Sequence, residues 1–262
     1  MNSSIQQITS SDNPQFKRLK KLVTSARERR KQQKTIVDGV HLLSVIAERN
    51  IQPEYVVVSS DAEADVEITT SLQQFSQIKR IGLDKRLFDQ LSPVETPSGI
   101  LALIDIPKHQ NSQIESAVVL ENIQDPGNLG TILRTAAASG ISRVYLSKGC
   151  AEAWSPKALR SGMGAQFVID ILEQCNLVNE VEKYEKVVAT SLEAADTFYE
   201  LDLSGSVAFV FGNEGAGVSR ELLAKATDKV KIPMPGDVES LNVSAAAAIC
   251  LFERVRQIRC TR

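Results

Sequence analysis

The sequence predicts an α/β protein, with a C-terminal domain built on a mostly parallel sheet with helices on both faces and a small N-terminal α/β sandwich. Three observations predict this class. Short apolar runs alternate with amphipathic segments along the chain. The runs expected as strands in the second half are apolar almost throughout, which is typical of sheets buried on both faces. Residues 107–116 are polar, contain Pro107 and show no apolar period, so they are expected to link the two domains.

The first expected domain, residues 1–106, begins with an amphipathic helix. Apolar side chains repeat at helical spacing over residues 14–31, and Asp12 or Asn13 is the expected N-cap. The elements that follow are expected at 35–38, 54–59, 78–83 and 100–104 for strands and at 40–48 and 84–91 for helices. This alternation predicts a small α/β sandwich.

The second expected domain, residues 117–262, repeats a strand-then-helix rhythm. Its strands are expected at 117–121, 144–146, 167–171, 187–190, 207–211 and 229–232, and its helices at 129–139, 156–162, 177–184, 219–226 and 244–259. Ligands of parallel sheets bind in the loops beyond the carboxyl ends of the strands. The functional residues are therefore expected in those loops.

Composition excludes several classes of function. The four cysteines lack CxxC spacing, and His41 and His109 lie far apart, so a zinc site, a disulfide scaffold and a Ser–His or Cys–His catalytic pair are not expected. We therefore expect no metal. The longest apolar runs are too short to cross a bilayer, and the N-terminus lacks a signal-peptide pattern. These features predict a cytoplasmic protein with no membrane partner.

A basic block stands out against a net charge of −2. Residues 17–34 contain nine lysines and arginines, opposed only by Glu28. Basic side chains that approach phosphates release counterions, so the block is a candidate polyanion-binding surface. A solvated helix face would show the same pattern, and the sequence leaves both interpretations open. The candidate contacts are Lys17, Arg18, Lys20, Lys21 and Arg30.

The first of three unusual loops is DPGNLG, at residues 125–130. Pro126 and Gly127 predict a turn, and Asn128 is expected to cap the helix that follows. Arg134 is a single cation in an otherwise apolar, alanine-rich stretch of that helix. A guanidinium in such surroundings usually meets a partner carboxylate or a phosphate.

The second loop is GNEGAG, at residues 212–217, directly after an apolar strand. A dinucleotide-binding fingerprint has the spacing GxGxxG, whereas this loop has GxxGxG. The carboxylate of Glu214 would also repel a pyrophosphate. Both features argue against the alternative of a nucleotide-dependent oxidoreductase. The glycines indicate a close backbone approach or a positive φ.

The third loop, residues 232–244, combines a rigid proline-containing backbone with three hydrogen-bonding side chains, Ser240, Asn242 and Ser244. One helix N-cap requires one such side chain. The surplus indicates a further role for this loop. The alanine run that follows gives the last helix a thin face, against which another element can pack closely.

These segments together resemble a known family. DPGNLGTILRTAAASG, FGNEGAGVS and IPMPGDVESLNVSAAAA are similar to the three signature motifs of the SpoU/TrmH family of RNA ribose 2′-O-methyltransferases, within residues 116–256. The basic helix and TIVDGVHLLSVIAE resemble the family's appended substrate-binding domain, which has a ribosomal-protein-like fold. The resemblance implies a deep trefoil knot in the C-terminal domain, a homodimer formed through that domain, and S-adenosylmethionine as the cofactor.

The resemblance also implies the residues of the site. The positions that match cofactor contacts are Thr190, Gly212, Ile232 and Leu241, and those linked to catalysis are Asn128, Arg134, Glu214, Ser240 and Asn242. A guanidinium stays protonated at neutral pH and is a poor general base. We therefore expect Arg134 to grip an RNA phosphate and stabilise the developing alkoxide. Asn128 and Glu214 would orient Arg134. Ser240 and Asn242 would hold the substrate.

The implied activity is S-adenosylmethionine-dependent methylation of a ribose 2′-hydroxyl in structured RNA, with the basic block as the RNA-binding surface. The appended domain favours ribosomal RNA as the partner, whereas the arginine-rich C-terminal stretch keeps transfer RNA as an alternative. A non-catalytic RNA-binding or ribosome-assembly protein of the same fold is a further alternative. The intact polar motifs argue against that last alternative.

Overall fold

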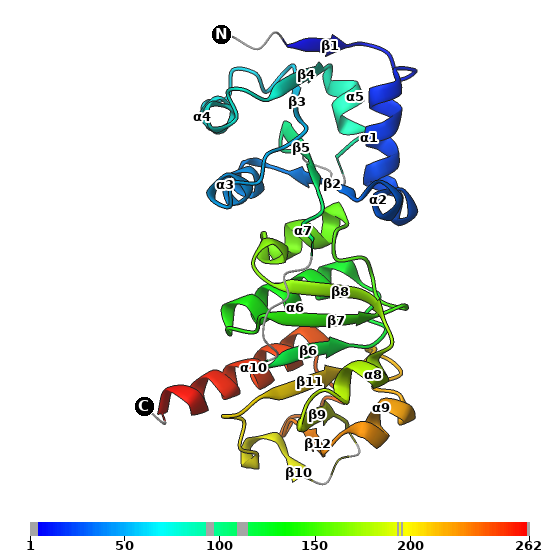
Figure 1. Cartoon of the computed structure of the whole chain (residues 1–262), viewed down its shortest axis with the longest axis vertical. Helices are drawn as coiled ribbons and strands as arrows, with labels where there is room; N and C mark the ends of the chain where they lie inside the picture. Colours follow the sequence, from blue (N-terminus) through cyan, green and yellow to red (C-terminus); the bar gives the residue numbers. More distant parts are fainter. Residues whose placement is uncertain (1–4, 93–96, 109–114, 193, 195, 261–262) are drawn as a thin grey trace. The chain divides into compact units, whose positions relative to one another are not determined.

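Figure 1 shows a computed structural model of the chain, which describes residues 5–92, 97–108, 115–192, 194 and 196–260. The chain forms two compact units. The first comprises Met1–Lys108 and Trp154–Phe167, and the second comprises His109–Ala153 and Val168–Arg262. The linker predicted at 107–116 includes residues 109–114, which lie outside the described residues, and it stays a prediction.

The first unit contains a five-stranded sheet in the order β1-β4-β3-β5-β2. Its strands are β1 (Gln6–Ile8), β2 (Lys34–Asp38), β3 (Tyr55–Ser59), β4 (Lys79–Leu83) and β5 (Ile100–Asp105). β1, β4 and β3 are parallel, and β5 is antiparallel to both β3 and β2. The sequence does not predict β1, because three residues are too few to show an alternating pattern.

Helices cover both faces of this sheet (Figure 1). The helices are α1 (Pro14–Thr24), α2 (Ala26–Gln32), α3 (Val40–Glu48), α4 (Val66–Gln74) and α5 (Lys85–Asp89). α1 and α5 bury Phe16, Leu19 and Phe88 in one core with strand residues. α3 and α4 pack together on the opposite face. α4 was not expected, since its β-branched residues disfavour a helix and its N-cap, Asp65, is the main local signal.

The single helix expected over residues 14–31 is wrong, because the structure has two helices there. Ser25 separates them with an extended backbone (φ −124°, ψ 111°). Its Oγ accepts a hydrogen bond from Glu28 N at 3.3 Å and so caps α2. Arg29 is buried, and its guanidinium donates to the carbonyls of Leu22 and Val23 near the end of α1. These bonds fix the corner between α1 and α2.

A segment from the middle of the chain completes the first unit. α7 (Pro156–Gly162) lies within Trp154–Phe167, which the sequence places in the second domain but which packs in the first unit. Thr35 on β2 donates its hydroxyl to the carbonyl of Trp154 at 2.6 Å. Arg160 lies 3.6 Å from the carboxylate of Asp38. Such contacts depend on tertiary packing, so a boundary based on composition does not reveal them.

The second unit contains a seven-stranded sheet, parallel throughout, in the order β10-β12-β9-β11-β6-β7-β8. Its strands are β6 (Ala117–Leu120), β7 (Arg143–Ser147), β8 (Asp170–Cys175), β9 (Lys186–Thr190), β10 (Asp196–Thr197), β11 (Val207–Phe211) and β12 (Asp228–Lys231). This confirms the predicted mostly parallel sheet. The strand expected at 167–171 is displaced, because Ala165–Phe167 form a 3₁₀ turn before β8.

Helices also cover both faces of the second sheet. They are α6 (Pro126–Ala138), α8 (Leu177–Val181), α9 (Arg220–Lys225) and α10 (Val243–Cys260). α6 and α10 pack against each other on one face, and α8 and α9 lie on the other (Figure 1). The core beneath α8 and α9 includes Val119, Tyr145 and Val210. Among the described residues, no helix is both long and apolar enough to cross a membrane.

Candidate active site

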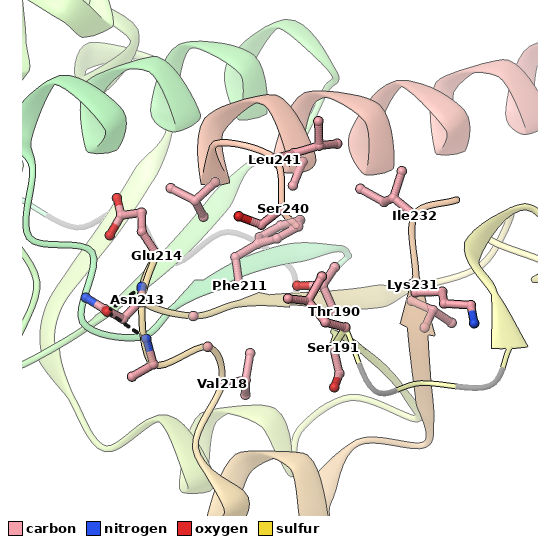
Figure 2. Close-up of a pocket in the computed structure, with 18 of the residues that line it drawn as sticks. Thr190, Ser191, Phe211, Asn213, Glu214, Val218, Lys231, Ile232, Ser240 and Leu241 are labelled. Carbon is pink, nitrogen blue, oxygen red and sulfur yellow. Dashed lines mark hydrogen bonds between the residues drawn. The ribbon is translucent and has the colours of Figure 1, made fainter. Parts of the chain in front are cut away.

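Neighbouring strand ends bring the three predicted loops together. β9, β11 and β6 are adjacent and parallel, so their carboxyl ends meet at one edge of the sheet. The loop after β11, the end of β9 and the segment between β12 and α10 enclose a cavity of about 440 Å³. In Figure 2, Glu214 lies on one side of this cavity, and Lys231 and Ile232 lie on the other. The cavity therefore lies where a parallel sheet binds ligands.

The glycine loop forms a tight turn against itself. Asn213 N donates to the carbonyl of Gly217 at 3.1 Å, and Gly217 N donates back to the carbonyl of Asn213 at 2.8 Å. A Cβ atom at Gly212 would overlap the Gly217 carbonyl, and Gly217 has a φ of +68°. Glycine is therefore required at Gly212 for close backbone approach and favoured at Gly217 for its positive φ. The loop presents backbone groups to the cavity.

All four residues predicted to bind the cofactor line this one cavity. They are Thr190, Gly212, Ile232 and Leu241, which come from three separate segments of the chain. Glu214 and Ser240 line it as well. The roles of these residues stay predictions, while their common location is a feature of the structure.

The cavity has apolar walls that the sequence analysis did not assign. Phe211, Val218, Met234 and Val243 line it together with the predicted residues. Phe211 and Val218 are buried. In the sequence they are indistinguishable from core residues, so only their place next to the glycine loop could have indicated them.

Three of the polar residues predicted to act in catalysis form one hydrogen-bonded chain. Asn128 Nδ2 donates to Glu214 Oε1 at 2.7 Å, and Asn242 Nδ2 donates to Asn128 Oδ1 at 3.1 Å. Asn242 Oδ1 in turn accepts from Ser244 N at 2.9 Å. Asn128 thus connects all three loops through its two side-chain atoms.

The expectation that Asn128 caps α6 is wrong. Asp125 is the N-cap, and its Oδ1 accepts a hydrogen bond from Asn128 N at 2.8 Å. Pro126 then occupies the first turn, where its missing N–H costs nothing. Because Asp125 takes the capping role, the side chain of Asn128 is available for Glu214 and Asn242.

Arg134 lies on α6 with an exposed side chain. Within the described part of the chain its side chain makes no hydrogen bond or ion pair, and Arg134 does not line the cavity. The structure thus does not join Arg134 to Asn128 or Glu214. Orientation of Arg134 by these two residues stays a hypothesis, and the guanidinium is free to meet an external anion.

The structure divides the basic block into paired and unpaired cations. Arg18 donates to Glu54 and Gln32, both at 2.8 Å, and Lys17 pairs with Asp12 at 2.7 Å. Four exposed cations of the block have no side-chain partner among the described residues. They are Lys21, Arg27, Arg30 and Lys31, near the corner between α1 and α2.

The parallel sheet, the glycine loop and the cavity beside α10 define a class of protein, and comparison identifies it. The chain belongs to the SpoU rRNA Methylase family, whose model matches residues 115–252. Residues 13–102 match the MRM3-like substrate binding domain. The family expected from the three motifs is thus confirmed.

Particular relatives are similar over nearly the whole chain. The chain is 33% identical over 252 residues to the 23S rRNA (guanosine(2553)-2′-O)-methyltransferase RlmP of Bacillus subtilis, covering 95% of this chain and 98% of that protein. It is 30% identical to the mitochondrial rRNA methyltransferase 3 of Homo sapiens, covering 91% of this chain and 71% of that protein.

Solved structures share the fold. A crystal structure of an RNA 2′-O ribose methyltransferase superposes with a TM-score of 0.83 at 27% identity, covering 96% of this chain and 99% of that one. The AdoMet-bound rRNA methyltransferase of Sinorhizobium meliloti has the same fold, with a TM-score of 0.82 at 24% identity, covering 97% of this chain and 98% of that one.

Proposed function

We infer that this protein methylates a ribose 2′-hydroxyl of ribosomal RNA with S-adenosylmethionine as the methyl donor. The observation that carries this inference is the convergence of Thr190, Gly212, Ile232 and Leu241 on one cavity. The chain of Glu214, Asn128 and Asn242 adjoins that cavity through Glu214. The similarity to rRNA 2′-O-methyltransferases along the whole chain supports ribosomal RNA as the substrate.

The cavity suits an adenosyl group in size and chemistry. Its volume of about 440 Å³ is within the range of small-molecule sites. Phe211, Ile232 and Leu241 offer apolar surface for a base and ribose, while the turn at Gly212 offers backbone hydrogen-bonding groups. When bound, S-adenosylmethionine supplies a methyl group activated by a cationic sulfur.

The protein's own residues would position the RNA and stabilise charge. Arg134, exposed and without an internal partner, is suited to grip a phosphate beside the target ribose and to stabilise negative charge on the 2′-oxygen. Asn128 holds Glu214 and Asn242 at fixed positions next to the cavity. Such alignment is the main contribution a protein makes when the donor is already activated.

Finer features of the family complete the proposal. We propose that the C-terminal domain is knotted, as the resemblance of the three motifs to the SpoU/TrmH family implies. We also propose a homodimer formed through this domain, as the resemblance of the three motifs to the SpoU/TrmH family implies. The ribosomal-protein-like identity of the N-terminal sandwich belongs to the same proposal.

Two measurements test the function. Calorimetry should show that the protein binds S-adenosylmethionine and not NAD, and binding of neither would leave only a non-catalytic RNA-binding role. Mapping of 2′-O-methyl groups in total RNA from cells with and without the gene should show one or more ribosomal positions lost. Loss confined to transfer RNA would overturn the ribosomal assignment and retain the chemistry.

A further inference from the structure

Side-chain hydrogen bonds join the carboxyl ends of three adjacent strands, β7, β6 and β11. Ser147, at the end of β7, accepts a hydrogen bond at its Oγ from Asn122 N at 2.9 Å. The carbonyl of Asn122, just beyond β6, accepts from Asn213 Nδ2 at 3.0 Å. Asn213 follows β11 and begins the glycine loop. These contacts involve Asn122, Ser147 and Asn213, none of which the catalytic or cofactor assignments include.

The backbone of Asn122 has an unusual conformation, which orients the Asn122 carbonyl toward Asn213. Its φ is +55°, in the left-handed region that Asn tolerates better than most residues. Ser147 Oγ also donates to Asn122 Oδ1 at 3.3 Å. A Cβ atom at Gly149 would overlap that Oδ1. Ser147 and Gly149, at and after the end of β7, therefore fix the position of Asn122, whose carbonyl accepts the hydrogen bond from Asn213.

The other end of the Asn213 amide shapes the glycine loop. Asn213 Oδ1 accepts hydrogen bonds from Gly215 N at 2.9 Å and from Ala216 N at 3.1 Å (Figure 2). Two N–H donors face this atom and a carbonyl faces Nδ2, so the orientation of the amide is defined by its neighbours. Only a side chain with both an acceptor and a donor satisfies both sides.

We propose that Asn213 is a positioning residue that performs two separable tasks. Through Oδ1 it holds the loop of residues 212–217 in the turn that lines the cofactor cavity. Through Nδ2 it ties that loop to Asn122 and so sets Glu214 against Asn128. The proposal rests on the methyltransferase function inferred above, and it adds a residue that links cofactor binding to the alignment of the polar chain.

Two variants of Asn213 separate the two tasks, and a third variant elsewhere is the control. Asn213→Asp is isosteric and keeps the acceptor for Gly215 N and Ala216 N, but it replaces the donor to Asn122 with a carboxylate oxygen. Asn213→Ala removes both contacts. The matched control is Asn176→Ala, which removes one side-chain hydrogen bond to the backbone, at the N-cap of α8 in the same unit.

The measurements are the Kd for S-adenosylmethionine by calorimetry, kcat for ribosomal RNA at saturating S-adenosylmethionine, and Tm. Asn213→Asp should keep the Kd within about threefold and lower kcat about tenfold, because the loop turn survives and its tie to β6 does not. Asn213→Ala should also raise the Kd about tenfold. Asn176→Ala should lower Tm while both constants stay at the wild-type values.

Two results would overturn the proposal. One is a Kd and kcat for Asn213→Ala that match the wild type. The other is a rise in Kd and a fall in kcat for Asn176→Ala equal to those for Asn213→Ala. That result would mean that Asn213 contributes only to the general stability of the protein. A wild-type protein that neither binds S-adenosylmethionine nor methylates RNA would instead refute the proposed function, so the two failures are distinguishable.

Discussion

Asp125 and Asn128 are three residues apart at the start of α6, and either side chain is suited to cap a helix. The structure gives the cap to Asp125 and leaves Asn128 with two side-chain partners from distant loops. Asn128, which the local sequence suggests as a helix cap, therefore belongs to the candidate site instead. It also explains why both a capping residue and a second polar residue occur in one short loop.

Substitution of Gly212 tests directly whether the cavity binds the cofactor. Gly212→Ala should raise the Kd for S-adenosylmethionine at least about tenfold, because the new methyl group would overlap the Gly217 carbonyl and force the loop to shift. Calorimetry measures this. Gly205→Ala is the control, since a Cβ atom there meets nothing within 4 Å. Equal affinities of the two variants would contradict the assigned cavity.

Substitution of Arg134 tests the methyl-transfer step separately from cofactor binding. Arg134→Ala should lower kcat at least about 100-fold, as expected when a group that stabilises developing charge is removed. The Kd for S-adenosylmethionine should stay within about threefold, because Arg134 does not line the cavity. Lys229→Ala removes another exposed cation from the same unit and serves as the control. Substantial methylation of the natural RNA by Arg134→Ala would show that the assignment is wrong.

At the scale of elements, the corner between α1 and α2 concentrates unpaired positive charge. Ser25 starts the second helix, and buried Arg29 bonds the end of the first. The exposed cations are then held on a defined corner. An uninterrupted helix would distribute them differently around its axis. The break between α1 and α2 therefore affects which basic side chains of this unit could contact RNA together.

Neutralising that corner should flatten the salt dependence of RNA binding. The variant carries K21Q, R27Q, R30Q and K31Q together, and the slope of log Kd against log salt should fall by about three, since each lost phosphate contact removes about 0.7–0.9. Arg18→Gln should change the slope less, because Arg18 already pairs with Glu54. Filter binding across a salt series measures both slopes. An unchanged slope in the quadruple variant would make this surface an ordinary solvated face.

At the scale of the whole molecule, the chain crosses between its two units more than once. Residues 154–167 belong to the first unit although residues on both sides of them belong to the second. Trp154 is 6% exposed, and its ring lies 5.8 Å from that of Phe167. The units are therefore not simple consecutive halves of the sequence.

Trp154 is the single tryptophan, so its fluorescence reports this packing. A fragment of residues 115–262 lacks Thr35 and the rest of β2, and Trp154 should become solvent-exposed with emission at longer wavelength than in the intact protein. The intact protein in denaturant provides the reference for full exposure. An emission maximum in the fragment equal to that of the native chain would show that residues 154–167 pack without the first unit.

The sequence alone was enough to predict most of the strands and helices, the parallel second sheet and the three loops of unusual composition. These features are local: periodicity, turn residues and caps act within a few residues of each other. The resemblance of their segments to the family's motifs, rather than local periodicity, predicted Gly212, Ile232 and Leu241, and the structure places all three on one cavity.

Which of these residues come into contact depends on the tertiary structure. Asn128 bonds partners 86 and 114 residues away, and Asn213 bonds a carbonyl 91 residues away. Strand order sets the contacts of Glu214 and Asn213 by placing β11 beside β6, and the packing of α10 on α6 brings Asn242 to Asn128. The assignment of α7 to the first unit and the division of the basic block into paired and unpaired cations have the same origin. Side chains distant in sequence become partners when packing fixes the elements that carry them.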